Sequence, residues 1–386
     1  MTDYTKKSLE GLWVGDCVGN LGQLYFAHDI LKALSEGVAK FGNQLSQFRN
    51  QFQYSDDTEE AIVLYNHIIS IPFRLSQDLL INQNEYAKDL ATRYMTRDPD
   101  GEIYGYGLNT RKVLRDIYEG IPWTDANKII KKSEGMPSHI DSLVSSLSNG
   151  KNFKDAIHDV NVHLNKQRLE EDGKTKVGSC GNGAAMRVAP LGAYFAENEY
   201  YNSLPKDICP STGFTSIEKY LIANATLQAE VTHCHPEGIA GSITITSLAF
   251  DVANSIVDYD LLYKNLLRRV PQGEVWDGIK KASELPKDTP VGKLREILGN
   301  GTHVTCQDTV PFCCFMAIKH VTNKNNLTSM YENAIIETSM AFGDVDTNCA
   351  IVGGIVGIIS TPPEKWVQFC QPMEGLFVPP VSKTKI

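Results

Sequence analysis

The sequence predicts an all-α protein with one domain, because apolar residues recur at helical spacing and rarely alternate with polar ones. The clearest apolar stripes are Ala61, Leu64, Tyr65 and Ile68, then Ile217, Tyr220, Leu221 and Leu227, then Ile239, Ile243 and Phe250. Pro236 precedes the third stripe and suits the first turn of a helix. Gly353, Gly354 and Gly357 lie in an otherwise apolar run, so we expect another helix to approach that run closely.

Domain organisation is simple, because the chain of 386 residues shows neither an internal repeat nor a clear linker. We expect one domain over residues 1–371 and a loosely held C-terminal tail over residues 372–386, where prolines precede a basic end. Residues 197–215 carry the asparagine, proline and glycine punctuation of a long loop. Residues 44–53 form a polar, glutamine-rich segment that we expect on the surface.

The composition argues against several classes of protein. A formal net charge of -9 argues against a broad nucleic-acid surface. Nine cysteines without a Cys-x-x-Cys pair argue against a disulfide framework or a cysteine zinc site, and they fit a reducing compartment. The N-terminus lacks the apolar core of a secretory signal, and the apolar run at residues 350–359 is too short to span a bilayer. We therefore expect a cytoplasmic protein, or one released by a route that leaves no N-terminal mark, without direct nucleic-acid or membrane binding. A monomer is the default expectation, because the sequence does not determine the oligomeric state.

Two acidic motifs precede predicted helices: Ser55-Asp56-Asp57, and Asp344-Val345-Asp346-Thr347. Taken singly, each is typical of a capped helix start, where carboxylates and hydroxyls bind free backbone amides. Capping accounts poorly for paired carboxylates, which repel one another unless a cation lies between them. Together the motifs offer oxygen ligands that suit magnesium, manganese or calcium rather than zinc. If the two helix starts converge, they can hold two ions that share carboxylates.

A glycine-rich motif, Gly178-Ser179-Cys180-Gly181-Asn182-Gly183, lies between the acidic motifs in the sequence. Its backbone can approach a ligand closely, and the amides of a following helix can bind phosphate oxygens. It is neither a Walker loop nor a convincing dinucleotide fingerprint, and taken alone it is better explained as a tight structural turn. Gly105-Tyr106-Gly107 and the run at residues 298–302 are weaker turn signals.

His233 and His235 stand two residues apart, between two predicted helices. This spacing does not place both on one helix face, so a transition-metal pair is only weakly indicated. Two other interpretations remain open for either residue. It could contact a phosphate or a ribose, or it could be a neutral histidine in the core.

The ordered set of motifs resembles the ADP-ribosylglycohydrolase family. The set is residues 15–19, 54–58, 178–187, 232–233 and 343–347, and the resemblance covers nearly the whole chain. The run at residues 178–187 and Ala27-His28-Asp29 look closest to the ADP-ribosylserine and poly(ADP-ribose) hydrolase branch. The resemblance implies a compact helical fold with two Mg²⁺ or Mn²⁺ ions in a cleft.

The resemblance also implies roles for single residues. It gives the metal ligands as Ser55, Asp56, Asp57, Asp344, Asp346 and Thr347, with the four aspartates central to catalysis. The residues it implies for substrate binding are Gly105 and Gly107 in one loop, Ser179, Cys180, Gly181 and Asn182 in the loop that holds the diphosphate and ribose, and His233. Gln23 is a further expected substrate-binding residue, and it stands where the family usually has a glutamate close to the metals.

The first functional hypothesis is a metal-dependent hydrolase that removes ADP-ribose from a modified acceptor by cleaving the bond at the anomeric carbon. Its expected partner is ADP-ribose or an ADP-ribosylated protein. The sequence leaves the acceptor open among serine, arginine, a polymer linkage, a nucleic-acid end and a small molecule. The alternative is an ADP-ribose-binding protein with little or no turnover, because the side chain of Gln23 cannot act as an acid or base. A structural descendant without metals is a third hypothesis.

Overall fold

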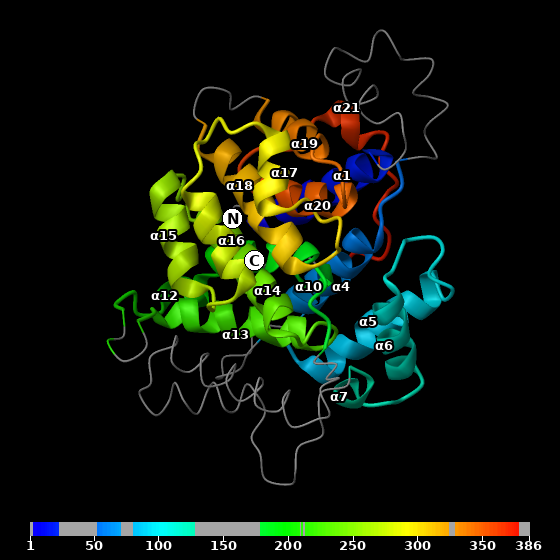
Figure 1. The fold of residues 1–386 in the computed structure, drawn as a ribbon. Helices are drawn as coiled ribbons and strands as arrows, with labels where there is room; N and C mark the ends of the chain where they lie inside the picture. The colour runs from blue at the N-terminus through cyan, green and yellow to red at the C-terminus, as the bar shows by residue number, and fades with distance from the viewer. Residues whose placement is uncertain are drawn as a thin grey trace, which may run out of the picture.

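The computed structural model describes residues 3–22, 52–70, 80–127, 178–208, 210, 213–323 and 329–377. Within these ranges the regular elements are all helices and no β-strand forms, which confirms the all-α prediction (Figure 1). The helices are α1 (Tyr4–Gly22), α4 (Asp56–Ser70), α5 (Gln83–Arg97), α6 (Leu108–Tyr118), α7 (Trp123–Ala126), α10 (Gly183–Met186), α11 (Ala189–Glu197), α12 (Glu199–Ser203), α13 (Ser216–Glu230), α14 (Pro236–Ala253), α15 (Tyr259–Arg269), α16 (Glu274–Ser283), α17 (Val291–Leu298), α18 (Cys306–Val321), α19 (Met330–Ser339), α20 (Val345–Val356) and α21 (Glu364–Val367).

Helices α1 and α20 pack along each other at backbone contact (Figure 1). Gly11, Gly15 and Gly19 recur every four residues and so line one face of α1. A Cβ atom at Gly15 would lie 2.2 Å from the carbonyl oxygen of Cys349, and one at Gly353 would lie 2.4 Å from that of Gly11. The close approach expected at the glycines of α20 is therefore confirmed, and it sets Asp16 on α1 beside the start of α20.

Helix α14 forms the centre of the core. Its residues are buried all round, as expected for a helix that is apolar or small on every face. It packs against α11, α13 and α18, and Pro236 is its first residue, as the sequence predicts. The stripes that begin at Ala61 and Ile217 lie on α4 and α13.

The long loop expected at residues 197–215 is partly wrong. Helix α11 extends to Glu197, and α12 follows almost at once. The side chain of Asn198 accepts hydrogen bonds from the amides of Tyr200 and Tyr201, so this residue caps a short helix instead of continuing a loop. Of the expected surface segment at residues 44–53, only Phe52 and Gln53 are among the described residues, and Phe52 is buried.

Residues 374–377 contact α4 and α5. Arg97 pairs with the carboxylate of Glu374, and the Asn66 side chain bonds the backbone of Gly375 and Phe377. The boundary between a domain and a tail at residue 372 stays a prediction. No helix of the described residues combines the length and apolarity that a membrane crossing needs.

Candidate metal and substrate site

The start of α4 is capped by an aspartate from α1. The Asp16 carboxylate accepts hydrogen bonds from the Ser55 amide, at 2.9 and 3.1 Å, and from the amide and hydroxyl of Thr58, at 3.1 and 2.6 Å. A residue of α1 therefore caps α4, so the carboxylates of Asp56 and Asp57 are not needed to cap it.

Asp57 is the point where the two acidic motifs meet. Its Oδ2 accepts hydrogen bonds from the hydroxyl of Ser55, at 2.8 Å, and from the hydroxyl of Thr347, at 3.2 Å. Its Oδ1 is buried, and among the described residues it has no hydrogen-bond partner. A buried carboxylate oxygen without a partner is costly, and a bound cation would satisfy it.

The second motif is positioned by two loops. Asp344 immediately precedes α20, and its amide donates to the carbonyl of Asn300 at 3.2 Å. Its Oδ2 accepts from the side-chain amide of Asn182 at 2.6 Å, which joins the acidic motif directly to the glycine-rich motif. A Cβ atom at Gly301 would lie 2.5 Å from the Cβ of Asp344, so only glycine allows this approach.

Asp16, Asp57 and Asp346 each offer a carboxylate oxygen within 4.8 Å of those of the other two. Burial first, and repulsion from Asp346 second, raise the pKa of Asp16 to about 7 and that of Asp344 to about 8. Burial and neighbouring carboxylates also raise the pKa values of Asp56 and Asp57 well above the usual range. A bound cation would relieve this repulsion between the carboxylates.

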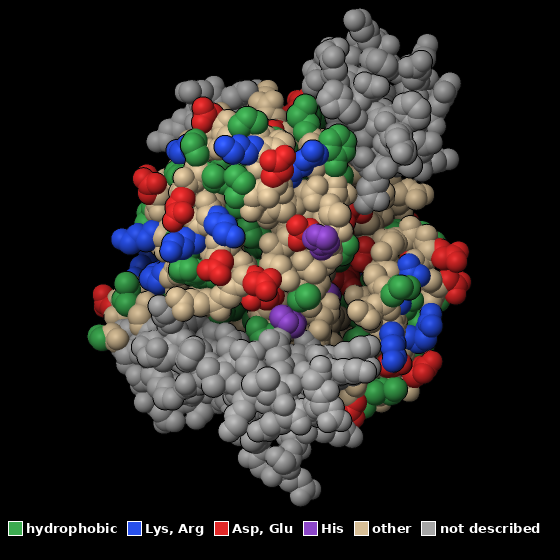
Figure 2. All heavy atoms as spheres, viewed as in Figure 1, with side chains coloured by type: hydrophobic (Ala, Val, Ile, Leu, Met, Phe, Trp, Pro, Cys, Tyr) green, Lys and Arg blue, Asp and Glu red, His purple; other side chains and the backbone are tan. Residues whose placement is uncertain are grey.

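Within the described ranges, no lysine, arginine or histidine forms an ion pair with any of these five aspartates. Carboxylate and hydroxyl oxygens without sulfur or imidazole suit Mg²⁺ or Mn²⁺. The chemistry of the donor set and the unpartnered oxygen of Asp57 therefore fit a divalent metal. Figure 2 shows acidic side chains in a hollow between the main body and the part formed by α5 and α6.

Asp16 was not among the site residues expected from the sequence. Asp16 does lie in the motif at residues 15–19 that supports the resemblance, between Gly15 and Gly19, which press α1 against α20. Because its oxygens already accept three backbone and hydroxyl donors, Asp16 is better suited to hold the Ser55–Thr58 turn than to be a principal metal ligand.

The loop before α6 borders the acidic cluster. The amide of Asp56 donates to the carbonyl of Tyr104 at 2.7 Å. Gly105 has a φ of +82°, and a Cβ atom there would lie 3.9 Å from the Asp56 carboxylate, so this glycine stands beside the site as expected. Gly107 lies further along, at the start of α6, and is exposed.

The glycine-rich motif folds as a turn followed by a four-residue helix, α10. The hydroxyl of Ser179 accepts from the amide of Gly181 at 3.0 Å, and the carbonyl of Cys180 accepts from the amide of Cys306 at 2.9 Å. The amide of Asn182 donates to the carbonyl of Val304 at 3.2 Å. Cys180 and Asn182 are thus held against Val304 and Cys306, at the start of α18.

His233 lies against the glycine-rich motif. A Cβ atom at Gly183 would lie 2.6 Å from the imidazole Cε1, and one at Gly181 would lie 3.2 Å from Nε2. The glycines therefore make room for the ring. Burial, and then the charge of Arg187, lower the pKa of His233 to about 3, so the ring is neutral at physiological pH. His235 instead caps α14, where its Nδ1 accepts from the amide of Glu237 at 3.1 Å.

The predicted site residues from both acidic motifs and the glycine-rich motif thus lie in one region, where α4, α10 and α20 contact one another (Figure 1). Gln23 lies outside the described residues. The structure adds Asp16, which caps α4, and Arg187, which contacts the residue before His233.

Comparison with known proteins points to one family. The family model described as ADP-ribosylglycohydrolase matches residues 2–376. Among solved structures, the chain is similar to one titled "ADP-ribosylglycohydrolase-related protein complex", with 14% sequence identity and a TM-score of 0.49, over 96% of this chain and 94% of that chain. None of the curated proteins compared with the sequence matches it.

Proposed function

The chain belongs to the ADP-ribosylglycohydrolase family, and from this premise we propose that it is a metal-dependent hydrolase that removes ADP-ribose from a modified acceptor. The observation that carries the proposal is the meeting of two distant acidic motifs around Asp57, whose Oδ1 is buried without a partner among the described residues. The link from Asp344 to Asn182 then sets the glycine-rich motif beside those carboxylates.

We assign the carboxylates of Asp56, Asp57, Asp344 and Asp346 as ligands of two Mg²⁺ or Mn²⁺ ions, with the hydroxyls of Ser55 and Thr347 completing the set. When bound, such ions supply positive charge and Lewis acidity for the attack of water at the anomeric carbon. The protein's own task is to hold the ligands in register. Asp16 does so by capping α4, and Asn182 by fixing one oxygen of Asp344.

The substrate side of the site is assigned to the loops around the carboxylates. Ser179, Cys180, Gly181 and Asn182 would bind the diphosphate and ribose through backbone and polar groups. His233 would contact the same part of the ligand, and the loop of Gly105 and Gly107 would line the cleft next to Asp56. The likeness of residues 178–187 to the ADP-ribosylserine branch makes a serine-linked substrate the first to test.

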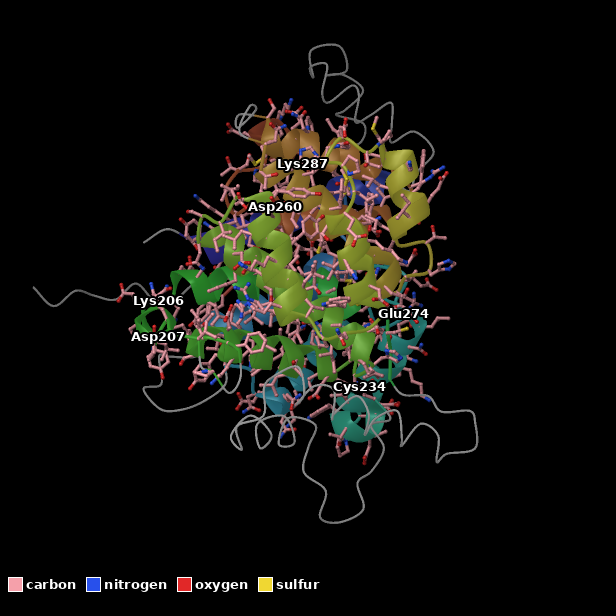
Figure 3. The ribbon with its side chains drawn as sticks, turned by 60° about the vertical axis from the view of Figure 1, so that its left-hand side comes forward. Lys206, Asp207, Cys234, Asp260, Glu274 and Lys287 are labelled. Carbon is pink, nitrogen blue, oxygen red and sulfur yellow. The ribbon has the colours of Figure 1, made fainter. Side chains whose placement is uncertain are left out.

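The test is release of ADP-ribose from peptides modified on serine or on arginine, in saturating Mg²⁺. We expect release by the unsubstituted protein and loss of release in Asp346→Asn. Asp260→Asn is the matched control, because Asp260 is exposed on α15 (Figure 3), and it should retain full release. Full release by Asp346→Asn would contradict the assignment of the acidic cluster.

The identity of Gln23 favours one other function, a protein that binds ADP-ribose with little turnover. Tight binding of ADP-ribose without release from either peptide would support that function. The Gln23→Glu variant then discriminates further, because a carboxylate at this position should restore turnover if its absence is what limits the reaction.

The monomeric state, the cytoplasmic location and the absence of direct nucleic-acid or membrane binding stay part of the proposal. The eight described cysteines are free thiols, which supports a reducing compartment.

A further inference from the structure

Arg187 is a fully buried arginine that connects α4, the helix that begins at the first acidic motif, to the residue before His233. Its Nη1 donates to Oε2 of Glu60 at 2.7 Å, and Glu60 lies on α4, one turn after Asp56. Its Nη2 donates to the Thr232 hydroxyl at 3.0 Å, and Thr232 directly precedes His233. One guanidinium thus contacts the helix that begins at the metal motif and the residue before the histidine.

The orientation of the Arg187 guanidinium is fixed by Gln228. The Nε of Arg187 donates to Gln228 Oε1 at 2.8 Å, and its Nη2 donates to the Gln228 carbonyl at 2.8 Å. The Nε2 of Gln228 donates to the Ala184 carbonyl at 2.9 Å and to the Ser242 hydroxyl at 2.6 Å. Because the amide nitrogen is committed to these acceptors, Gln228 presents its oxygen to the arginine.

The Thr232 hydroxyl therefore has only one arrangement that satisfies its neighbours. It accepts a hydrogen bond from Arg187, which cannot accept one in return. Its own proton remains, and the Nδ1 of His233 lies 2.8 Å from the hydroxyl oxygen. Among the described residues, no other hydrogen bond involves this hydroxyl. The proton is thus directed at Nδ1, which must carry a lone pair, and a neutral imidazole then has its proton on Nε2.

The Nε2 atom of His233 faces the glycine-rich motif. A Cβ atom at Gly183 would lie 2.8 Å from it, and one at Gly181 would lie 3.2 Å from it. In the described part of the chain no hydrogen bond uses Nε2, so its proton is available to a ligand. The opposite tautomer would direct a lone pair at the same place and would repel the oxygens of a diphosphate or ribose.

We propose that Arg187 and Thr232 are positioning residues that fix His233 in the tautomer with its proton on Nε2, so that His233 donates a hydrogen bond to an oxygen of ADP-ribose. The ligand in this inference rests on the proposed function, whereas the tautomer stands on the protein alone. The oxygen belongs either to the diphosphate or to a ribose hydroxyl, since both accept hydrogen bonds.

The tautomer is measured by nitrogen NMR on the full-length protein labelled with ¹⁵N-histidine, with the His233 signals assigned by their loss in His233→Gln. We expect a pyridine-like Nδ1 and a protonated Nε2, unchanged between about pH 5 and pH 8 because the ring stays neutral there. Thr232→Ser keeps the hydroxyl and should keep this tautomer. Thr232→Val removes the hydroxyl at similar volume and should give a mixture of tautomers.

Binding of ADP-ribose in saturating Mg²⁺ is measured on the same variants by calorimetry. The Kd should rise about tenfold in Thr232→Val and by less than about twofold in Thr232→Ser. A proton on Nδ1 in the unsubstituted protein would overturn the proposal, and so would an unchanged tautomer and Kd in Thr232→Val. ADP and adenosine are titrated to identify the acceptor. If Thr232→Val does not weaken binding of ADP, the acceptor is on the distal ribose. If it weakens binding of ADP but not of adenosine, the acceptor is the diphosphate, and if it weakens both, the acceptor is the adenosine ribose.

Two further outcomes are decisive. If Thr232→Val does not fold, His233→Gln and His233→Asn replace it, since glutamine carries its amide near the Nε2 position and asparagine near the Nδ1 position. Binding kept by Gln and lost in Asn supports the proposal, and the reverse order overturns it. If the predicted tautomer is observed but ADP-ribose does not bind, the proposed function is wrong, whereas the tautomer is still supported. Failure of the proposed function is thus distinguished from failure of the tautomer assignment.

Discussion

The hydroxyl of Thr347 lies 3.2 Å from Oδ2 of Asp57, so two acidic motifs 290 residues apart in the sequence meet at one carboxylate. Each motif stands at the start of a helix, and each is typical of a helix cap if it is taken alone. The contact between them is possible because α1 presses its glycine face against α20 and, through Asp16, caps α4. A helix pair at backbone contact thus brings the carboxylates together.

Replacing Asp57 with asparagine should change stability in opposite directions with and without metal. In EDTA, Asp57→Asn removes one buried charge from a repulsive cluster, and the free energy of unfolding should rise by about 1 kcal/mol. The increase in melting temperature that Mg²⁺ produces should be lost. Thermal unfolding with EDTA and with Mg²⁺ measures both effects. Asp260→Asn should show neither, and a full Mg²⁺ response in Asp57→Asn would count against the ligand assignment.

A methyl group at Gly183 should displace His233 without affecting the metal ligands. The Cβ of Gly183→Ala would lie 2.6 Å from Cε1 of the imidazole, which is too close for a side chain that is itself buried. We expect ADP-ribose binding to weaken at least about tenfold, while the Mg²⁺-induced thermal shift is retained. Gly292→Ala on α17 is the control, because a Cβ there meets nothing within 4 Å. Equal ADP-ribose affinity in both variants would contradict the close fit of His233.

Much of this arrangement can be predicted from the sequence, because it depends on local patterns. Apolar spacing marks α4, α13 and α14, and the acidic motifs stand at the starts of α4 and α20, as expected. The glycines of α20 indicate close packing, although nothing in the sequence identifies α1 as the partner. These features are local because a helix and its cap are specified within a few residues.

The roles of Asp16 and Arg187 depend on tertiary contacts that the sequence does not reveal. Asp16 caps a helix that starts 40 residues further along, and its neighbours Gly15 and Gly19 were the only signal of its packing. Arg187 lies in an expected motif, but its connection to His233 passes through the Thr232 hydroxyl. Such networks combine residues from separate helices, so no spacing rule identifies them.

Backbone strain next to the site predicts a stabilising substitution. Val304 has a φ of +53°, which a β-branched residue adopts only at a cost, and the residue is 54% exposed. Val304→Asn should raise the free energy of unfolding by about 1 kcal/mol, because asparagine tolerates this conformation. Urea unfolding measures the change. Val304→Thr retains the β-branch and should give no gain, and an equal gain in both variants would show that backbone strain is not the cause.

The ion pairs of Glu218 predict a stability loss in acid. Burial alone would raise its pKa, but hydrogen bonds from Arg268 and the charge of Arg269 outweigh burial and lower it to about 2. Because the folded pKa lies below the unfolded value, the stabilisation is complete above about pH 5 and is lost as the pH falls toward about 2. Glu218→Gln should therefore reduce the free energy of unfolding by about 2 kcal/mol at pH 7, and by less than about half as much near pH 3.

Urea unfolding of Glu218→Gln at several pH values tests this account. Glu296→Gln is the control, since Glu296 is exposed on α17. A constant difference between Glu218→Gln and the unsubstituted protein from pH 7 to pH 3 would mean that the ion pairs do not set the stability.

The central claim is that the acidic cluster holds divalent metal for hydrolysis of an ADP-ribose bond. The most direct measurement is release of ADP-ribose from a peptide modified on serine, first by protein stripped with EDTA and then as Mg²⁺ is restored. The account predicts no release in EDTA and a saturable return of release with Mg²⁺. Release at the same rate in EDTA as in saturating Mg²⁺ would contradict it.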